Sequence, residues 1–331
     1  MKNVVFLLLI FSFSITKAQH TFSIVAVDSV TGEIGSAGAT CGDSIIWPGT
    51  PGAKIISEIL PGKGAIHTQS YYLKANQTNA HDRMMAGDSP KQIIAWLVAN
   101  DVENYPEIRQ YGVVDFNNGH PRSAAYTGAD CMDYKNHILG KNYAIQGNIL
   151  IGKRVLDSME ARFKRTPGAL AEKLMAAMQG AKMVGADSRC TSNGTSSLSA
   201  FIRVAYPNDK PTAMYLDINV AGVAKGTEPI DKLQTKYNVW KLTAGTKTPQ
   251  NLNKVHIEIF PNPSNKVVEI KLDNAQVDKI EITDITGRVV LVQEVKSKLT
   301  EIDMESWMSG IYFINFYKGE LKLTIAKIMK Y

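Results

Sequence analysis

The sequence predicts an α+β domain followed by a smaller all-β module. In the first part of the chain, predicted strands and helices follow the order strands, two helices, strands, two helices, strands. Most of these strands meet at short turns, such as 117–119, which favours antiparallel sheets covered by paired helices. Residues 255–331, by contrast, contain only short strands separated by turns.

The first eighteen residues have the composition of a secretion signal. Lys2 precedes the apolar run 4–13, and the small residues Thr16 and Ala18 stand three and one positions before a predicted cut. The run is too short to span a bilayer, which requires about 20 apolar residues. We therefore expect a cleaved signal at 1–18, an exported protein, and no membrane span in the mature chain.

The α+β domain is assigned to residues 19–235. Its strands are predicted at 21–27, 34–40, 64–69, 110–116, 122–127, 143–151, 197–205 and 213–220. Its helices are predicted at 71–86, from the capping pair Ser89-Pro90 onward, at 153–164 and at 168–182. Small residues fill the strand at 34–40, so we expect another element to pack closely on it. A glycine-rich βα fingerprint is absent, which disfavours a dinucleotide-binding fold.

A polar stretch at 236–254, rich in Thr and Lys, is predicted to be a linker. The module at 255–331 has predicted strands at 267–272, 279–283, 288–295, 311–317 and 321–328. Spacing of this kind is typical of a small immunoglobulin-like sandwich.

The formal net charge of +6 is spread along the chain. Residues 255–331 carry ten basic and eleven acidic side chains, whereas 19–254 carry 25 basic and 20 acidic ones. Since no basic run or Arg-rich helix is present, we expect no nucleic-acid partner.

The three cysteines, Cys41, Cys131 and Cys190, are far apart in the sequence. Zinc sites need closely spaced Cys and His ligands, so we expect no metal site. No phosphate-binding loop is visible either, and we expect no cofactor. In an exported protein, three cysteines suggest one disulfide and one free thiol.

Four motifs near the C-terminus carry a resemblance. They are FPNP at 260–263, DITGR at 284–288, SGIY at 309–312 and KIMK at 327–330. Together they resemble the type A sorting domain of the type IX secretion system of Bacteroidetes. The resemblance implies that the type IX machinery carries the folded protein across the outer membrane. The product would then be secreted or attached to the outer cell surface.

A second resemblance covers residues 21–235. Its motifs include TFSIVA at 21–26, GVVD at 112–115, TGADC at 127–131 and QGNIL at 146–150. They resemble the family of domain of unknown function 1028, which is grouped with N-terminal nucleophile (Ntn) hydrolases. The resemblance implies a four-layer αββα sandwich, in agreement with the order of strands and helices.

The fold group implies amide hydrolysis by the side chain of the first residue, with its own α-amino group as base. Thr21, which begins the first strand, is the candidate nucleophile. Cleavage after Ala18 would leave Gln19 and His20 in front of it, so two alternatives stay open. Either these residues are trimmed, or Thr21 only starts a β-strand.

Polar residues at strand ends and in polar loops are candidates for lining a substrate cleft, although each could instead cap a loop. They are Gln69, Asn148, Asp187 and Arg189. The TGADC motif matches the usual family pattern, which implies that Cys131 is unpaired. Cys41 and Cys190 are therefore predicted to form a disulfide.

Two functions follow as hypotheses. The first is a secreted Ntn-type hydrolase that cleaves a small amide or peptide bond with Thr21. The second is a non-catalytic extracellular or cell-surface binding protein with the same fold. Either would take a small-molecule or peptide ligand, and the sequence leaves open whether copies of the chain associate.

Overall fold

The computed structural model describes residues 21–45, 48–244, 257–272, 277–319 and 321–331. These fall into two compact units, Met1–Lys241 and Leu242–Tyr331. The predicted signal at 1–18 lies outside the described residues. None of the described helices has the length and apolarity needed to cross a membrane.

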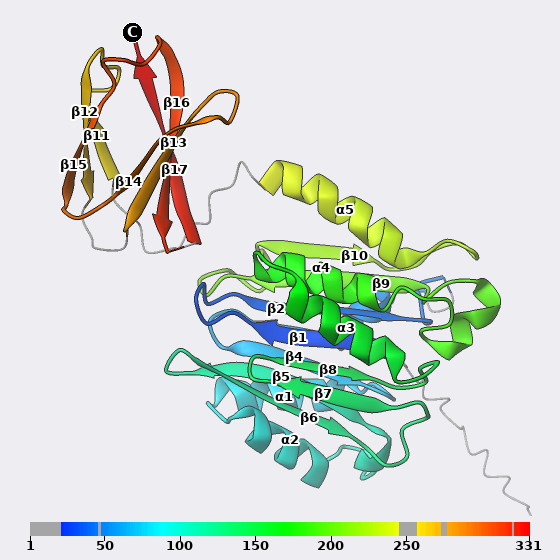
Figure 1. Cartoon of the computed structure of the whole chain (residues 1–331). Helices are drawn as coiled ribbons and strands as arrows, with labels where there is room; N and C mark the ends of the chain where they lie inside the picture. The colour runs from blue at the N-terminus through cyan, green and yellow to red at the C-terminus, as the bar shows by residue number, and fades with distance from the viewer. Residues whose placement is uncertain (1–20, 46–47, 245–256, 273–276, 320) are drawn as a thin grey trace, which may run out of the picture. The chain divides into compact units, whose positions relative to one another are not determined.

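The first unit contains two antiparallel sheets (Figure 1). The six-stranded sheet has the order β10-β9-β2-β1-β8-β7. Its strands are β1 (Thr21–Val27), β2 (Ile34–Thr40), β7 (Asn136–Gly140), β8 (Tyr143–Gly147), β9 (Ser199–Ala205) and β10 (Leu216–Val220). The four-stranded sheet has the order β3-β4-β5-β6. Its strands are β3 (Ser57–Leu60), β4 (Gly64–Gln69), β5 (Gln110–Asn117) and β6 (His120–Thr127).

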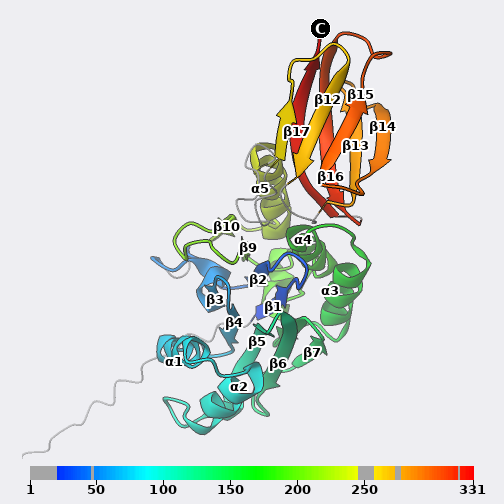
Figure 2. The ribbon, with the colours of Figure 1, turned by 90° about the vertical axis from the view of Figure 1, so that its left-hand side faces the viewer.

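Helices cover the outer face of each sheet, as the two views in Figures 1 and 2 show. The helices α3 (Arg154–Arg165) and α4 (Leu170–Gly180) share an apolar core with the six-stranded sheet. The helices α1 (Lys74–Met85) and α2 (Pro90–Ala99) share another with the four-stranded sheet. Three short 3-10 helices, η1 (Gly52–Ile56), η2 (Pro106–Ile108) and η3 (Ser188–Asn193), lie in the connections. The αββα sandwich is therefore confirmed.

The small residues of β2 make room for α4. A Cβ atom at Gly35 would lie 2.4 Å from Leu174 Cδ1, closer than any side chain tolerates. The expected close packing on this strand is thus a contact with a helix.

Residues 236–244 are helical rather than linker. The helix α5 (Pro229–Ala244) continues through them and buries Ile230, Leu233 and Tyr237 in the core of the six-stranded sheet. These apolar side chains recur at helical spacing, but Thr and Lys between them give the segment a polar average. The rest of the predicted linker, from residue 245, lies outside the described residues.

Two further differences concern strands. β3 and β7 had not been predicted, and β8 ends at Gly147 rather than at residue 151. The strand stops there because Ile149 adopts φ 52°, a left-handed conformation that ends sheet pairing.

The second unit is an all-β sandwich, as predicted, but its described residues form seven strands rather than the five expected, because those at 257–260 and 299–303 had not been predicted. One sheet has the order β11-β12-β15 and the other β14-β13-β16-β17. The strands are β11 (Ile257–Phe260), β12 (Val267–Leu272), β13 (Lys279–Asp284), β14 (Val289–Glu294), β15 (Leu299–Asp303), β16 (Gly310–Lys318) and β17 (Leu321–Lys330). Both sheets contribute side chains, among them Ile270 and Ile314, to one core.

Candidate functional site

The space between the two sheets of the first unit changes from apolar to polar along β1. Side chains of a strand alternate between its faces, so alternate residues of β1 point toward the four-stranded sheet. Val25 and Val27 pack there in an apolar layer with Ile59 and Val114. Thr21 and Ser23, at the start of the strand, face polar residues instead.

Thr21 is fully buried, and backbone pairing with Thr40 of β2 holds it in the sheet. Its amide N donates to Asn148 Oδ1 at 3.1 Å, and its carbonyl O accepts from Asn148 N at 3.2 Å. The Oγ1 atom, in contrast, is buried without a hydrogen-bond partner in the described part of the chain. A buried hydroxyl in that state is uncommon, because leaving it unpaired costs about 1–3 kcal/mol.

Asn148 lies among residues whose backbone conformation is uncommon. Its Nδ2 donates to Ser70 Oγ at 2.8 Å. Ser70, Tyr71 and Ile149 all have positive φ, between 52° and 58°. Non-glycine residues adopt this region at a cost, and such residues concentrate at functional sites.

Gln69 uses its whole side-chain amide to fix β1. Its Oε1 accepts from Ser23 Oγ at 2.6 Å, and its Nε2 donates to the Thr21 carbonyl at 3.1 Å and to Gln110 Oε1 at 2.7 Å. Since Gln69 is buried and fully bonded, it positions Thr21 rather than lining a cleft.

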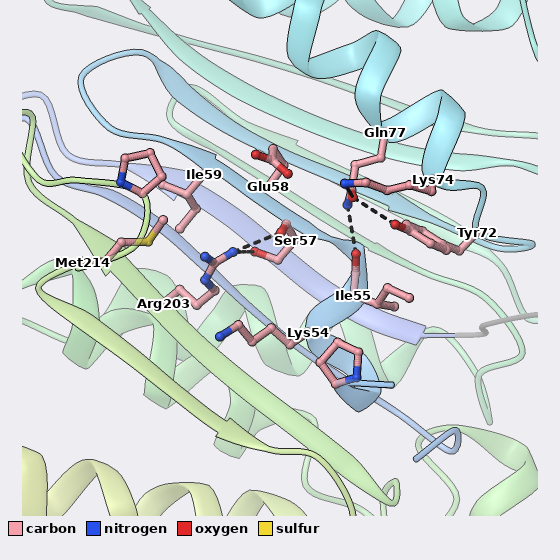
Figure 3. Close-up of a pocket in the computed structure, with 12 residues that line it drawn as sticks. Lys54, Ile55, Ser57, Glu58, Ile59, Tyr72, Lys74, Gln77, Arg203 and Met214 are labelled. Carbon is pink, nitrogen blue, oxygen red and sulfur yellow. Dashed lines mark hydrogen bonds between the residues drawn. The ribbon is translucent and has the colours of Figure 1, made fainter. Parts of the chain in front are cut away.

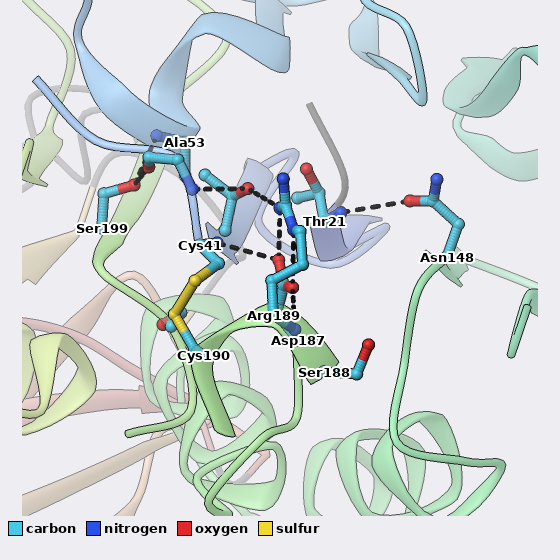
Figure 4. A network of polar contacts seen from close by, with 12 residues as sticks. Thr21, Cys41, Ala53, Asn148, Asp187, Ser188, Arg189, Cys190 and Ser199 are labelled. Atoms are coloured by element: carbon cyan, nitrogen blue, oxygen red, sulfur yellow. Dashed lines mark hydrogen bonds and ion pairs between the residues drawn. A yellow bond between two sulfur atoms is a disulfide. The ribbon is translucent and has the colours of Figure 1, made fainter. Parts of the chain in front are cut away.

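Asp187 and Arg189 form an ion pair at the same end of the sheet (Figure 4). Arg189 Nη2 lies 2.6 Å from Asp187 Oδ2 and donates to Thr40 Oγ1 at 3.3 Å. Asp187 is fully buried, whereas 31% of the Arg189 side chain remains exposed. Of the predicted cleft residues, only Arg189 can therefore reach solvent.

A disulfide joins Cys41, directly after β2, to Cys190 in η3 (Figure 4). The amide N of Cys41 also donates to Asp187 Oδ2 at 2.8 Å. Both links tie the loop that carries Asp187 and Arg189 to the strand beside Thr21. Cys131 is buried and free, and burial raises the pKa of its thiol.

A row of polar side chains, which we call the polar seam, leads from Gln69 to Arg203 of β9, and all its members are buried except the partly exposed Arg203. Its members are Gln69, Ser23, Gln146, His67, Ser36, Ser57 and Arg203. His67 stands at its centre, with Nδ1 2.9 Å from Ser23 Oγ and Nε2 2.6 Å from Ser36 Oγ. Burial, and secondly the charge of Arg203, lower the pKa of His67 to about 3, so the ring is neutral at physiological pH.

Glycine at position 112 makes room for the seam. A Cβ atom there would lie 2.1 Å from Gln146 Oε1, so any other residue would displace the Gln146 amide. This amide contacts both Ser23 Oγ and His67 Nδ1. The GVVD motif thus includes a position at which packing requires glycine.

Thr21 and the four predicted cleft residues all gather at one end of the sandwich. Sequence reasoning missed Thr40, Ser70 and Gln110, which hold them in place. Gln110 pairs with the predicted residue Gln69 across neighbouring strands, a register that no local sequence pattern reports. Among the described residues, no group of three or more His, Cys, Asp or Glu side chains could hold a metal ion.

Comparison with known proteins gives two family matches. The model described as "Family of unknown function (DUF1028)" matches residues 21–233. The model described as "Secretion system C-terminal sorting domain" matches residues 258–330.

Two individual proteins are also similar to parts of this chain. The crystal structure of protein SPO2555 from Silicibacter pomeroyi, a DUF1028 protein, has a TM-score of 0.52 at 22% identity. The match covers 66% of this chain and 88% of that one, and it shows the fold alone. Ulvan lyase NLR42 from Nonlabens ulvanivorans is 26% identical over 91 residues, which are 27% of this chain and 17% of the enzyme.

Proposed function

The chain belongs to the DUF1028 family, and we propose that it is an amidohydrolase of the Ntn type with Thr21 as nucleophile. The sorting domain at 258–330 makes it a secreted or surface-attached protein handled by the type IX machinery. The catalytic part of the proposal rests on the environment of Thr21.

The observation that carries the proposal is the unpaired Oγ1 of Thr21. Every other polar group of this residue is engaged, since Asn148 binds the N and O atoms and Gln69 also binds the O atom. A nucleophile needs an oxygen that is not engaged in a structural hydrogen bond, in a residue whose backbone is fixed, so that its proton is available to the base.

The reaction requires cleavage of the bond between His20 and Thr21. The Thr21 nitrogen then becomes an α-amino group, with Asn148 Oδ1 accepting one of its hydrogens. As Oγ1 attacks the substrate carbonyl carbon, the amine takes the hydroxyl proton and passes it to the leaving nitrogen. Water next attacks the ester on Thr21, which releases the acid and restores the hydroxyl.

Arg189 supplies the only exposed charge among the predicted site residues. Its guanidinium is oriented by Asp187 and by Thr40, the sheet partner of Thr21. A cation held in this way suits a substrate that carries a carboxylate. We therefore favour an acylated amino acid or short peptide as the substrate class.

A non-catalytic binding protein is the second candidate, and one observation favours it. In the full chain the Thr21 nitrogen belongs to a peptide bond, and the residue has no exposed surface. If residues 19 and 20 remain in place, no base is available and the fold serves binding alone.

Sequencing of the mature N-terminus separates the two functions. The protein recovered from the culture medium of a secreting cell should begin at Thr21. A β-lactone probe should then form an ester with Oγ1, which mass spectrometry would locate on the first residue. A first residue of Gln19, together with no labelling of Thr21, would contradict the enzyme hypothesis.

Variants test the role of the hydroxyl directly. Thr21→Ala should lower hydrolysis of an acyl amino acid panel by roughly 10³-fold or more, while Thr21→Ser keeps measurable activity. Thr68→Ala is the matched control, because Thr68 Oγ1 is likewise buried and without a partner but lies inside β4. Equal activity in both alanine variants would contradict the assignment.

A further inference from the structure

The first unit also has a cavity that is separate from the site around Thr21. It is an open cavity of about 520 Å³ between η1, β3, the start of α1 and the β9–β10 segment (Figure 3). None of its lining residues belongs to the Thr21 site. Its lining residues are Pro51, Lys54, Ile55, Ser57, Glu58, Ile59, Tyr72, Lys74, Gln77, Arg203, Pro211 and Met214.

Positive charge is the first property of this cavity. Lys54, Lys74 and Arg203 line it, against a single acidic lining residue, Glu58. Figure 3 shows Arg203 and Lys54 near one another and Lys74 on the other side of Ser57. An anion between them would meet cations from both sides.

Arg203 is the central group, because its Nε atom is buried without a hydrogen-bond partner among the described residues. Its Nη1 donates to Ser57 O and Oγ at 3.0 and 3.1 Å, both neutral acceptors. The Asp217 carboxylate forms an ion pair with Arg203, but its oxygen lies 3.6 Å from Nε, beyond hydrogen-bond distance. Lys54 Nζ already binds both oxygens of that carboxylate, at 2.7 and 2.8 Å.

The remaining lining groups are fixed in place. Gln77 Oε1 accepts from Tyr72 Oη at 3.0 Å and from Lys74 Nζ at 3.2 Å, while Gln77 Nε2 donates to Ile55 O at 2.9 Å. Burial, and secondly Glu58, raise the pKa of Tyr72 to about 12, so its hydroxyl remains a donor at neutral pH. The wall is therefore preorganised, which lowers the entropic cost of binding.

Apolar side chains complete the wall and define the ligand. Ile55, Ile59 and Met214 lie beside the cations, together with two prolines. Inorganic phosphate could contact the cations but not the apolar part of the wall, whereas an organic carboxylate could contact both. We propose that this cavity binds an organic monocarboxylate, with its carboxylate near Arg203 and Lys74 and its apolar part against Ile55 and Met214.

Calorimetric titration of the mature protein with sodium octanoate tests the proposal. Octanoate should bind saturably, whereas octanamide, which has the same shape without the charge, and inorganic phosphate should bind at least about tenfold more weakly. Equal binding of octanamide would overturn the role of charge. Equal binding of phosphate would overturn the assignment to an organic carboxylate.

Variants locate the site. Lys74→Gln, at an exposed position, should weaken octanoate binding about threefold to tenfold, and Lys63→Gln, an exposed lysine outside the cavity, should leave it unchanged. Glu58→Gln should strengthen it about twofold to fivefold, a gain that a folding defect would not produce. Unchanged affinity in both the Lys74 and Glu58 variants would overturn the proposal. Arg203→Lys, if folded by circular dichroism, should weaken binding more than Lys74→Gln does.

Discussion

The hydroxyl of Thr21 reduces the stability of the fold at the position where it lies. A buried hydroxyl without a hydrogen bond loses its hydration and gains nothing in return. Thr21→Val replaces it by a methyl group of nearly the same shape in a β-strand that favours valine. We expect the free energy of unfolding to rise by about 1 kcal/mol while any hydrolytic activity is lost.

Urea unfolding of the two isosteric variants Thr21→Val and Thr68→Val checks this prediction. Both should be as stable as the parent or more so, because both remove an unpaired buried hydroxyl. Only the first should affect function. A loss of more than about 1 kcal/mol in Thr21→Val would mean that Oγ1 has a structural partner in solution.

His67 makes a separate contribution that depends on pH. Its pKa is about 3 in the folded chain and about 6.5 in the unfolded chain, so the unfolded state binds more protons between these values. The neutral ring thus contributes stability that is fully present above pH 6.5 and is lost as the pH falls toward 3. The added slope should approach about 1.4 kcal/mol per pH unit.

The measurement is urea unfolding at several pH values from about 7 to about 3, a range that spans the folded and the unfolded pKa of His67. His67→Gln should be less stable at neutral pH but should show a shallower loss on acidification. His120→Gln, at the exposed first residue of β6, should follow the parent profile. Parallel profiles for parent and His67→Gln would contradict the prediction.

At the scale of elements, the disulfide holds η3 against the end of β2. The crosslink closes a sequence separation of 149 residues and removes chain entropy from the unfolded state. The double variant Cys41→Ala/Cys190→Ala should lose about 3 kcal/mol of unfolding free energy. Amide exchange at residues 187–193 should also accelerate, since the loop retains only its noncovalent links.

Reduction supplies the control for this effect. Dithiothreitol should destabilise the parent protein and leave the double variant unchanged, because Cys131 is not part of the bond. If the reductant destabilised both proteins equally, the loss would arise elsewhere.

All but the last three residues of helix α5 belong to the first unit, because the buried face of the helix packs on the six-stranded sheet. The helix offers a matched pair of leucines, Leu233, which is fully buried, and Leu242, which is 82% exposed. Leu233→Ala should cost about 2–4 kcal/mol, and Leu242→Ala less than about 0.5 kcal/mol. Thermal unfolding of the two variants compares them directly, and equal losses would place α5 outside the core.

The order of strands and helices was predictable because apolar periodicity is a local property of the chain. The strands β3, β7, β11 and β15 were missed because each is only four or five residues long. The helical part of the predicted linker was missed because apolar residues at three- and four-residue spacing are diluted by Thr and Lys.

The site was predictable only in part, for a physical reason. Polar residues at strand ends could be named from the sequence, and they gather around Thr21. Their roles depend on partners more than a hundred residues away, such as Asn148 for Thr21. Whether Gln69 faces a substrate or fixes a strand is decided by the register of two sheets, which no local pattern contains.

At the scale of the whole molecule, the two units have separate cores and separate tasks. Among the described residues, the core of the second unit is formed by its own side chains. Deleting residues 258–331 should therefore leave the unfolding free energy of the first unit unchanged within about 0.5 kcal/mol.

In a bacterium with a type IX secretion system, the same deletion should remove the protein from the medium and the cell surface and retain it inside the outer membrane, as immunoblots of the fractions would show. Ile314→Asp, which places a charge in the core of the sorting domain, should reproduce the retention, whereas Val292→Asp on its exposed surface should not prevent folding of that domain. Release of the deleted form into the medium would mean that the first unit carries its own export information.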